Sequence, residues 1–187
     1  MKAILICGSR NPQGQTAQAG EAVLEGLKAH GAQVQTALLP QMRIEHCRQC
    51  DQRGWGICRQ EGRCVIEDDF GQLVEQIRSA DVVVFATPVY CADLSDSLRV
   101  FLDRFRRTIV QDQARAAVAG KRAIGVCVAG GGGGGAPFCS FNLDNILRTC
   151  GFDVVDVVPV RRQNLQLKLE VLRMTGTWLA TPPSPQA

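Results

Sequence analysis

Five short apolar segments alternate with stretches of helical periodicity along this chain, and this alternation restricts the possible folds more than any other feature. The apolar segments occupy residues 3–7, 34–39, 82–86, 121–128 and 152–158. Continuous apolar runs of this length are typical of parallel strands buried on both faces. The pattern therefore predicts an α/β fold, a doubly wound five-stranded parallel sheet with helices on both faces.

Helical spacing of apolar residues follows each predicted strand except the second. It covers residues 16–30, 94–107, 138–150 and 165–179, and a further helix runs from an Asp68-Asp69 cap through Ile77. Residues 40–68 lack a period and form the one long loop, which contains four cysteines. We expect one domain at 1–180 that includes this Cys-rich loop, and a disordered tail at 181–187.

Composition excludes several classes of function. The net charge of +3 is too small to favour nucleic acid, and aromatic residues at 5% provide few stacking platforms. No apolar run approaches the length of a membrane span, and the first apolar stretch is too short for a signal peptide. Nine cysteines without a secretion signal indicate a reducing compartment, so we expect a cytoplasmic protein.

Ligands of parallel α/β sheets bind beyond the carboxyl ends of the strands, here at loops 8–16, 87–94 and 129–137. The first loop joins a buried strand to a helix N-terminus, which attracts anions, and Ser9, Arg10 and Thr16 add hydroxyls and charge. Its glycines fit neither a P-loop nor a dinucleotide fingerprint. A terminal phosphomonoester therefore fits better than a pyrophosphate. The alternative is an ordinary turn with a helix cap.

The other two loops combine features that suit a flat ring. Loop 87–94 carries Pro88, Tyr90 and small residues, and Pro88 is expected outside the strand because it cannot donate to a central ladder. The alternative is a capped loop with Asp93 as the N-cap. Six glycines at 130–135 are either a flexible linker or a wall that lets backbone approach a ring, and we favour the wall.

The cysteines of the long loop have the spacing C-x2-C-x7-C-x5-C, with Cys47, Cys50, Cys58 and Cys64 inside 18 residues. Thiolates this dense usually hold a metal or an iron–sulfur cluster. The spacing alone leaves a cluster, a zinc site and unliganded thiols open. Cys7, Cys127, Cys139 and Cys150 fall in predicted strands and helices, so we expect them to be core residues.

Several motifs occur in order across residues 1 to about 158. They are Gly8-Ser9 with Gly14-x-Thr16, Gly62-Arg63-Cys64-Val65-Ile66-Glu67-Asp68-Asp69-Phe70, Ala80-Asp81, Thr87-Pro88-Val89-Tyr90, Leu98 with Phe101-Leu102-Asp103-Arg104, and Gly120-Lys121. Through them the chain resembles the flavodoxin-like family of NAD(P)H-dependent FMN reductases, and within it the iron–sulfur flavoprotein branch. The blocks from Cys64 to Asp69 and from Thr87 to Tyr90 carry most of this resemblance.

The resemblance implies FMN as the cofactor. The implied phosphate contacts are Ser9, Arg10, Asn11, Gly14, Gln15 and Thr16. The implied ribityl and ring contacts are Thr87, Pro88, Val89, Tyr90, Cys91, Gly130, Gly131, Gly132, Gly133 and Gly134. It also implies a [4Fe–4S] cluster on Cys47, Cys50, Cys58 and Cys64. Two departures from the family pattern are an insertion around Gly54-Trp55-Gly56 and Cys91 at a position where relatives often carry an aromatic residue.

We expect an FMN-binding oxidoreductase that moves electrons between a reduced donor and an acceptor, with a cluster on the Cys-rich loop. No catalytic side chains stand out, so the protein would position a cofactor that carries the reaction. The alternatives are an NAD(P)H-dependent FMN or quinone reductase without a cluster, and a non-enzymatic protein whose loop binds zinc. The expected partners are a redox protein or a small-molecule acceptor and a further copy of the chain, with no nucleic acid and no membrane.

Overall fold

The computed structural model describes residues 1–181 and contains one parallel sheet with the strand order β2-β1-β3-β4-β5. The strands are β1 (Lys2–Cys7), β2 (Gln33–Leu38), β3 (Val82–Pro88), β4 (Arg122–Ala129) and β5 (Asp153–Arg161). β1, β3 and β4 lie in the middle of the sheet and are buried almost throughout. The predicted flavodoxin-like sheet of five parallel strands is confirmed.

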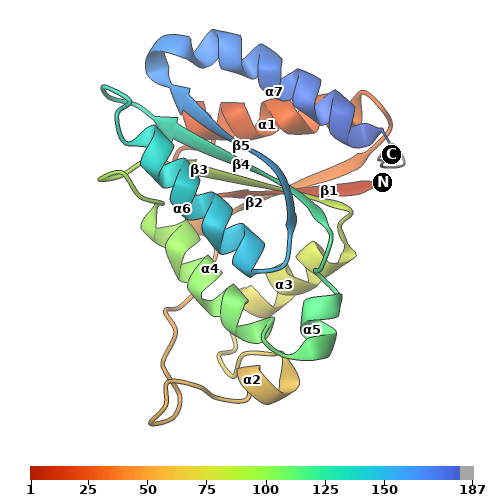
Figure 1. Cartoon of the computed structure of the whole chain (residues 1–187), viewed down its shortest axis with the longest axis vertical. Helices are drawn as coiled ribbons and strands as arrows, with labels where there is room; N and C mark the ends of the chain where they lie inside the picture. The colour runs from red at the N-terminus through yellow and green to blue at the C-terminus, as the bar shows by residue number, and fades with distance from the viewer. Residues whose placement is uncertain (182–187) are drawn as a thin grey trace.

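Helices cover both faces of the sheet. They are α1 (Gln15–Lys28), α2 (Cys58–Glu61), α3 (Phe70–Ser79), α4 (Asp96–Thr108), α5 (Asp112–Ala116), α6 (Ala136–Thr149) and α7 (Leu165–Ala180), with short 3-10 turns at Leu39–Gln41 and Arg162–Asn164. Helices α1 and α7 pack side by side on one face, while α3, α4 and α6 cover the other (Figure 1). Each layer has its own apolar core. No helix of residues 1–181 is long and apolar enough to span a membrane.

The predicted elements match the structure except at their ends. Strand β3 extends to Pro88, which was expected in a loop, and its Cα pairs with that of Val128. The proline is tolerated because it is the last residue of the strand, and the next ladder bond comes from Val89 N to Val128 O at 2.9 Å. Helix α4 begins at Asp96 rather than Leu94, because Ser95 is its N-cap and accepts a hydrogen bond from Leu98 N.

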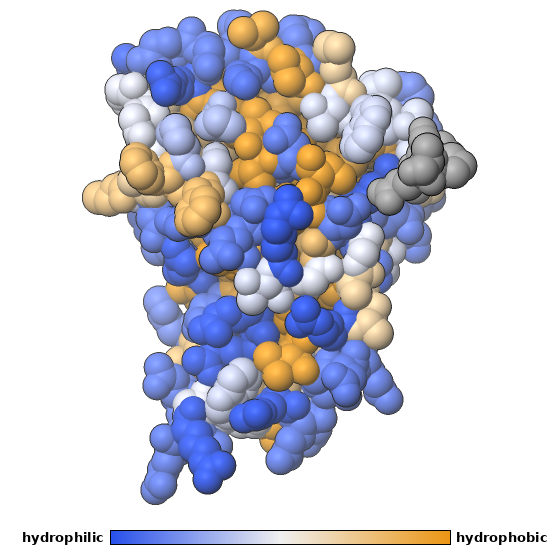
Figure 2. All heavy atoms as spheres, in the orientation of Figure 1, coloured by the Kyte–Doolittle hydropathy of each residue, from blue (hydrophilic) through white to orange (hydrophobic). Residues whose placement is uncertain are grey.

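The Cys-rich segment leaves the sheet after β2 and returns at α3, and it forms the end of the molecule opposite α7 (Figure 1). Hydrophilic side chains dominate that end, whereas apolar ones gather toward the opposite end of the same face (Figure 2). Sequence periodicity did not reveal α2 or α5, because both are shorter than two turns. Of the predicted tail, residues 182–187 lie outside the described residues.

Candidate cofactor site

The loops after β1, β3 and β4 meet at one edge of the sheet, because these parallel strands are neighbours. Ser97 Oγ donates a hydrogen bond to Gly8 O at 3.2 Å, which ties the first loop to α4. A Cβ on Gly8 would lie 2.3 Å from Ser95 Oγ, so only glycine allows this approach. A Cβ on Gly135 would lie 2.9 Å from Ala92 Cα, so the loops after β3 and β4 also touch.

The first loop has the features of an anion site. Ser9 Oγ donates to Asn11 O at 3.1 Å, and Asn11 Oδ1 accepts from Gln13 N at 3.0 Å, so the loop is held by its own side chains. No side chain caps α1, and its first turn carries no acidic residue. Ser9 and Thr16 are buried at the base of the loop. The free backbone N–H groups at the start of α1 and the two hydroxyls suit a phosphate.

Two further expected phosphate contacts, Arg10 and Asn11, lie at the rim of the loop. Arg10 is mostly exposed and forms an ion pair with the equally exposed Asp96 at 3.7 Å. An exposed pair of this kind is weak, so Arg10 remains free to turn toward an anion. Gln15 is half-buried in the first turn of α1 and Asn11 is exposed. The predicted phosphate-binding residues therefore belong to one loop and the start of α1, and they differ in how deeply they are buried.

The loop after β3 forms a tight turn between Tyr90 and Asp93, which exchange backbone hydrogen bonds at 3.0 and 2.9 Å. Cys91 and Ala92 occupy its tip with φ of 49° and 63°. Tyr90 and Cys91 are exposed and accessible to a ligand. Thr87 is fully buried instead, and its hydroxyl accepts a hydrogen bond from Ser95 N at 2.9 Å. Thr87 thus supports the turn from below.

Asp93 connects this turn to its neighbours. Its carboxylate accepts hydrogen bonds from Leu94 N at 2.7 Å, from Arg99 and from Asn142 Nδ2 at 3.4 Å. Arg99 belongs to α4 and Asn142 to α6, so Asp93 joins two helices to the loop. The alternative of Asp93 as the N-cap of α4 is wrong, since Ser95 occupies that position.

The glycine run is a mostly exposed loop that is held at Gly131 and Gly133. Gly130, Gly131, Gly132 and Gly134 have open space where a side chain would lie. Gly133 is buried with a φ of +83°, and a Cβ there would lie 2.6 Å from Arg161 Cδ. Gln163 Nε2 also donates to Gly131 O at 3.2 Å. The run is thus held by Arg161 at the end of β5 and by Gln163 in the turn that follows it.

We expect Gly132→Val to weaken FMN binding roughly 5- to 150-fold, which corresponds to about 1–3 kcal/mol of steric conflict. The free energy of unfolding should change by less than about 0.5 kcal/mol, since the position is exposed and open. Fluorescence titration and urea unfolding measure the two effects. Gly71→Val, also in open space but on α3, is the control for valine itself. Unchanged FMN affinity would favour the linker interpretation.

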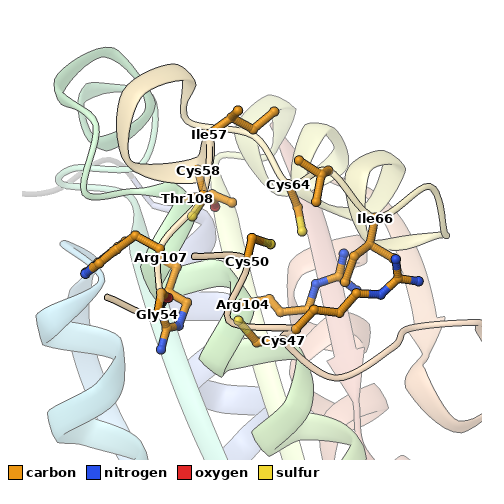
Figure 3. Close-up of a pocket in the computed structure, with 14 residues that line it drawn as sticks. Cys47, Cys50, Gly54, Ile57, Cys58, Cys64, Ile66, Arg104, Arg107 and Thr108 are labelled. Carbon is orange, nitrogen blue, oxygen red and sulfur yellow. Dashed lines mark hydrogen bonds between the residues drawn. The ribbon is translucent and has the colours of Figure 1, made fainter. Parts of the chain in front are cut away.

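Four cysteines of the long loop line one cavity of about 20 Å³, which has room for about one water molecule. Figure 3 shows Cys47, Cys50, Cys58 and Cys64 approaching this cavity from different parts of the loop, with Arg104 and Arg107 beside them. All four are free thiols. Within residues 1–181, however, no three Cys, His, Asp or Glu side chains lie close enough together to ligate one metal ion.

The inserted residues form a compact turn beside this cavity. Asp51 Oδ1 accepts hydrogen bonds from Arg53 N and Trp55 N, both at 2.8 Å, and Gly54 has a φ of +75°. The Trp55 ring lies against the guanidinium of Arg107, whose carbon is 5.2 Å from the ring centroid. The insertion therefore keeps Cys50 and Cys58 on the same cavity.

A fully buried ion pair supports the cavity from below. Arg104 donates to both carboxylate oxygens of Asp68, at 2.6 and 3.0 Å, and to Glu45 O at 3.0 Å. Its guanidinium carbon also lies 4.2 Å from the Phe70 ring centroid. Burial alone would raise the pKa of Asp68, but the hydrogen bonds from Arg104 and Glu45 N hold that pKa below its usual value.

A larger open cavity of about 460 Å³ connects the two halves of the site. Arg10 of the phosphate-binding loop and His46, which precedes Cys47, both line it. Residues after β2 and the first turn of α4 complete its walls. A group bound at the first loop would therefore share a cavity with the start of the cysteine segment.

The remaining predicted cysteines behave as core residues. Cys7, Cys127, Cys139 and Cys150 are completely buried. Burial raises the pKa of the Cys150 thiol to about 12, which keeps it protonated and unreactive.

Sequence reasoning missed Ser95, Ser97 and the arginines around the cysteine loop. Arg104 and Arg107 are three residues apart in the second half of α4, a spacing that places them on one side of the helix. That spacing was visible in the sequence. Nothing in the sequence indicated that Asp68, 36 residues earlier, would be buried against Arg104.

The sheet order and the loops at its carboxyl edge define a flavodoxin-like protein. The sequence profile of the NADPH-dependent FMN reductase family matches residues 1–163. The chain therefore belongs to that family.

Similar proteins agree with this assignment. An iron–sulfur flavoprotein of Methanocaldococcus jannaschii is 30% identical over 131 residues, which is 70% of this chain and 65% of the relative. The chain thus matches slightly less than two thirds of that relative's length. A solved NAD(P)H:quinone oxidoreductase from Methanothermobacter marburgensis superposes with a TM-score of 0.73 at 20% identity, covering 100% of this chain and 99% of the other. An archaeal flavodoxin gives 0.62 at 14% identity, covering 96% of both chains.

Proposed function

We propose that this protein is an FMN-binding oxidoreductase that passes electrons between its flavin and a [4Fe–4S] cluster on the Cys-rich loop. The observation that carries the proposal is the cavity lined by all four loop cysteines in a member of an FMN reductase family. The relative named an iron–sulfur flavoprotein supports it.

The residues at the sheet edge fit FMN. The uncapped start of α1 offers backbone donors, and Ser9 and Thr16 offer hydroxyls to a phosphate. Tyr90 and Cys91 at the tip of the β3 turn, and the open glycine run, leave room for the ring. Bound flavin would supply hydride and one-electron chemistry. The chain itself would orient the ring through the β3 turn, which Asp93 fixes to α4 and α6.

The donor set on the Cys-rich loop fits an iron–sulfur cluster. Four thiols are the ligands such a cluster needs, and the adjacent guanidinium groups of Arg104 and Arg107 offset its negative charge. The small volume between the thiols means that the loop must open slightly to admit the group. The cluster would supply one-electron transfer. Cys47, Cys50, Cys58 and Cys64 would hold it, and His46 lies on the side that faces the cavity shared with Arg10.

A second candidate is an NAD(P)H-dependent FMN or quinone reductase without a cluster, in which the cysteines bind zinc or nothing. The solved quinone oxidoreductase with the same fold favours it.

Anaerobic purification followed by flavin, iron and zinc analysis distinguishes these functions. The proposal expects FMN and about four irons per chain, with a broad absorption beneath the flavin bands. FMN without iron, together with NAD(P)H-dependent reduction of a quinone, would favour the reductase. One zinc ion per chain without flavin would instead favour the third alternative, a non-enzymatic protein whose loop binds zinc.

We expect Thr16→Ala to weaken FMN binding about 5- to 150-fold, because losing a hydroxyl bonded to a dianion costs about 1–3 kcal/mol. Riboflavin, which lacks the phosphate, should bind both forms equally. Thr175→Ala is the matched control, since its exposed hydroxyl donates only to Val171 O on α7. An equal loss of riboflavin affinity would show that Thr16 acts on the loop shape and not on the phosphate.

A further inference from the structure

Three arginines hold the Cys-rich loop by its backbone. Arg104 donates to Glu45 O at 3.0 Å, Arg107 donates to Gly54 O, and Arg78 donates to Gly62 O at 3.2 Å. Glu45 lies two residues before Cys47, and Gly62 lies two residues before Cys64. Gly54 lies between Cys50 and Cys58. The loop is therefore fixed from α3 and α4 near each of its cysteine segments.

The same three arginines carry unpaired buried donors. Within residues 1–181, four buried side-chain polar atoms have no hydrogen-bond partner: the Nε atoms of Arg78, Arg104 and Arg107, and Ser140 Oγ. A buried donor without an acceptor is unfavourable, and more so when the group is charged. Three of the four therefore lie beside the Cys-rich loop, where a bound acceptor would satisfy them.

The position of these donors indicates what the acceptor is. Arg104 and Arg107 line the cavity with the four cysteines, and Arg78 lines an adjoining cavity with Cys64. Sulfide and thiolate sulfurs of an iron–sulfur cluster accept hydrogen bonds, and such bonds tune its reduction potential. A guanidinium beside the cluster also favours the more negative, reduced form.

Charge compensation distinguishes two of the arginines. Asp68 holds Arg104 with two hydrogen bonds, so most of that charge is neutralised. Arg107 has only Asp103 Oδ2 at 3.9 Å from its Nε, and the same carboxylate accepts a hydrogen bond from Arg106 at 2.6 Å. The Arg107 side chain is nonetheless only 15% exposed. Arg107 is thus the less compensated positive charge at the cavity.

We propose that Arg107 is a positioning residue that sets the reduction potential of the cluster. Its Nη1 fixes the turn at Gly54, and its side chain lines the cavity together with the four cysteines, so its positive charge lies beside the sulfurs that they would hold. Adding one electron from a reductant such as dithionite makes the iron–sulfur group one charge more negative, and Arg107 stabilises that form. The inference rests on the proposed function, because it requires the cysteines to hold a cluster.

The test compares Arg107→Gln, Arg107→Lys and the control Arg106→Gln after anaerobic reconstitution with iron and sulfide. Arg106 is the neighbouring residue on α4, is 44% exposed and does not line the cavity. Iron per chain and the midpoint potential of the cluster are measured for each. We expect Arg107→Gln to shift the one-electron equilibrium at least tenfold toward the oxidised form, which is a potential about 59 mV lower. Arg107→Lys keeps the positive charge, so its cluster potential should stay close to that of wild type. Arg106→Gln should have the wild-type potential.

The outcomes separate this inference from the function on which it rests. A wild-type protein that takes up no iron overturns both. A wild-type cluster whose potential is the same in Arg107→Gln and Arg106→Gln overturns the role of Arg107 and leaves the proposed function intact. If Arg107→Gln takes up no iron, the lysine variant decides: a potential near wild type supports the role of the charge. An iron-free lysine variant shows that Arg107 only shapes the loop.

Discussion

Arg104→Ala is expected to lower the free energy of unfolding by about 3–5 kcal/mol, the largest stability effect of any single change at this site. Removing Arg104 leaves the Asp68 carboxylate charged, fully buried and without its two guanidinium bonds. It also releases Glu45 O at the start of the Cys-rich loop. Urea unfolding followed by circular dichroism measures the loss.

Two comparisons attribute that loss to the buried pair. Arg106→Ala removes an exposed arginine of the same helix and should cost less than about 1 kcal/mol. The double change Arg104→Met with Asp68→Leu removes both charges and should recover much of the stability, because an apolar pair of similar volume carries no desolvation penalty. A double variant as unstable as Arg104→Ala would mean that packing, and not the unpaired charge, explains the loss.

The same pair gives a pH dependence with a defined sign. The pKa of Asp68 is lower in the folded protein than its ordinary value of 3.8. Its stabilisation is therefore present above that value and is lost as the pH falls through the lower folded pKa. The difference in unfolding free energy between wild type and Asp68→Asn should be full at neutral pH and shrink below about pH 4.

The sequence predicted the sheet and the edge at which the loops after β1, β3 and β4 meet, because both depend on local, repeated patterns. Buried parallel strands leave continuous apolar runs, and the helices between them leave a period. The errors of the sequence prediction lie at the ends of elements, where a single contact decides where a strand or helix stops or begins. Pro88 ends β3 because the next ladder bond comes from Val89, and α4 begins at Asp96 because Ser95 provides the cap. Contacts of this kind leave no repeat in the sequence.

The structure of the Cys-rich loop also depends on individual contacts that leave no pattern in the sequence. Spacing identified the four cysteines but did not decide whether the insertion around Trp55 separates them. The structure shows that the insertion is a turn closed by Asp51 and held by Arg107, so the cysteines still line one cavity. The contact between Arg107 and Gly54 joins segments 53 residues apart, and no local pattern records it. The expected homo-oligomer and the electron donor and acceptor stay predictions.

Cys→Ser at any one of Cys47, Cys50, Cys58 or Cys64 is expected to reduce iron uptake to background. Each thiol lines the same cavity, and a four-iron cluster needs all four as ligands. Iron per chain after anaerobic reconstitution measures the effect. Cys127→Ala, in the buried strand β4 and away from the loop, should keep wild-type iron content.

The identity of the metal follows from the same variants. A single zinc ion holds four thiolates about 3.8 Å apart, since each Zn–S bond is about 2.3 Å and the geometry is tetrahedral. A four-iron cluster holds the thiolates farther apart, so the two occupants require different openings of the Cys-rich loop. If the protein takes up no iron but binds one zinc through these cysteines, the loop must close further than it does here. The electron relay would then be wrong, and a zinc-braced FMN reductase would replace it.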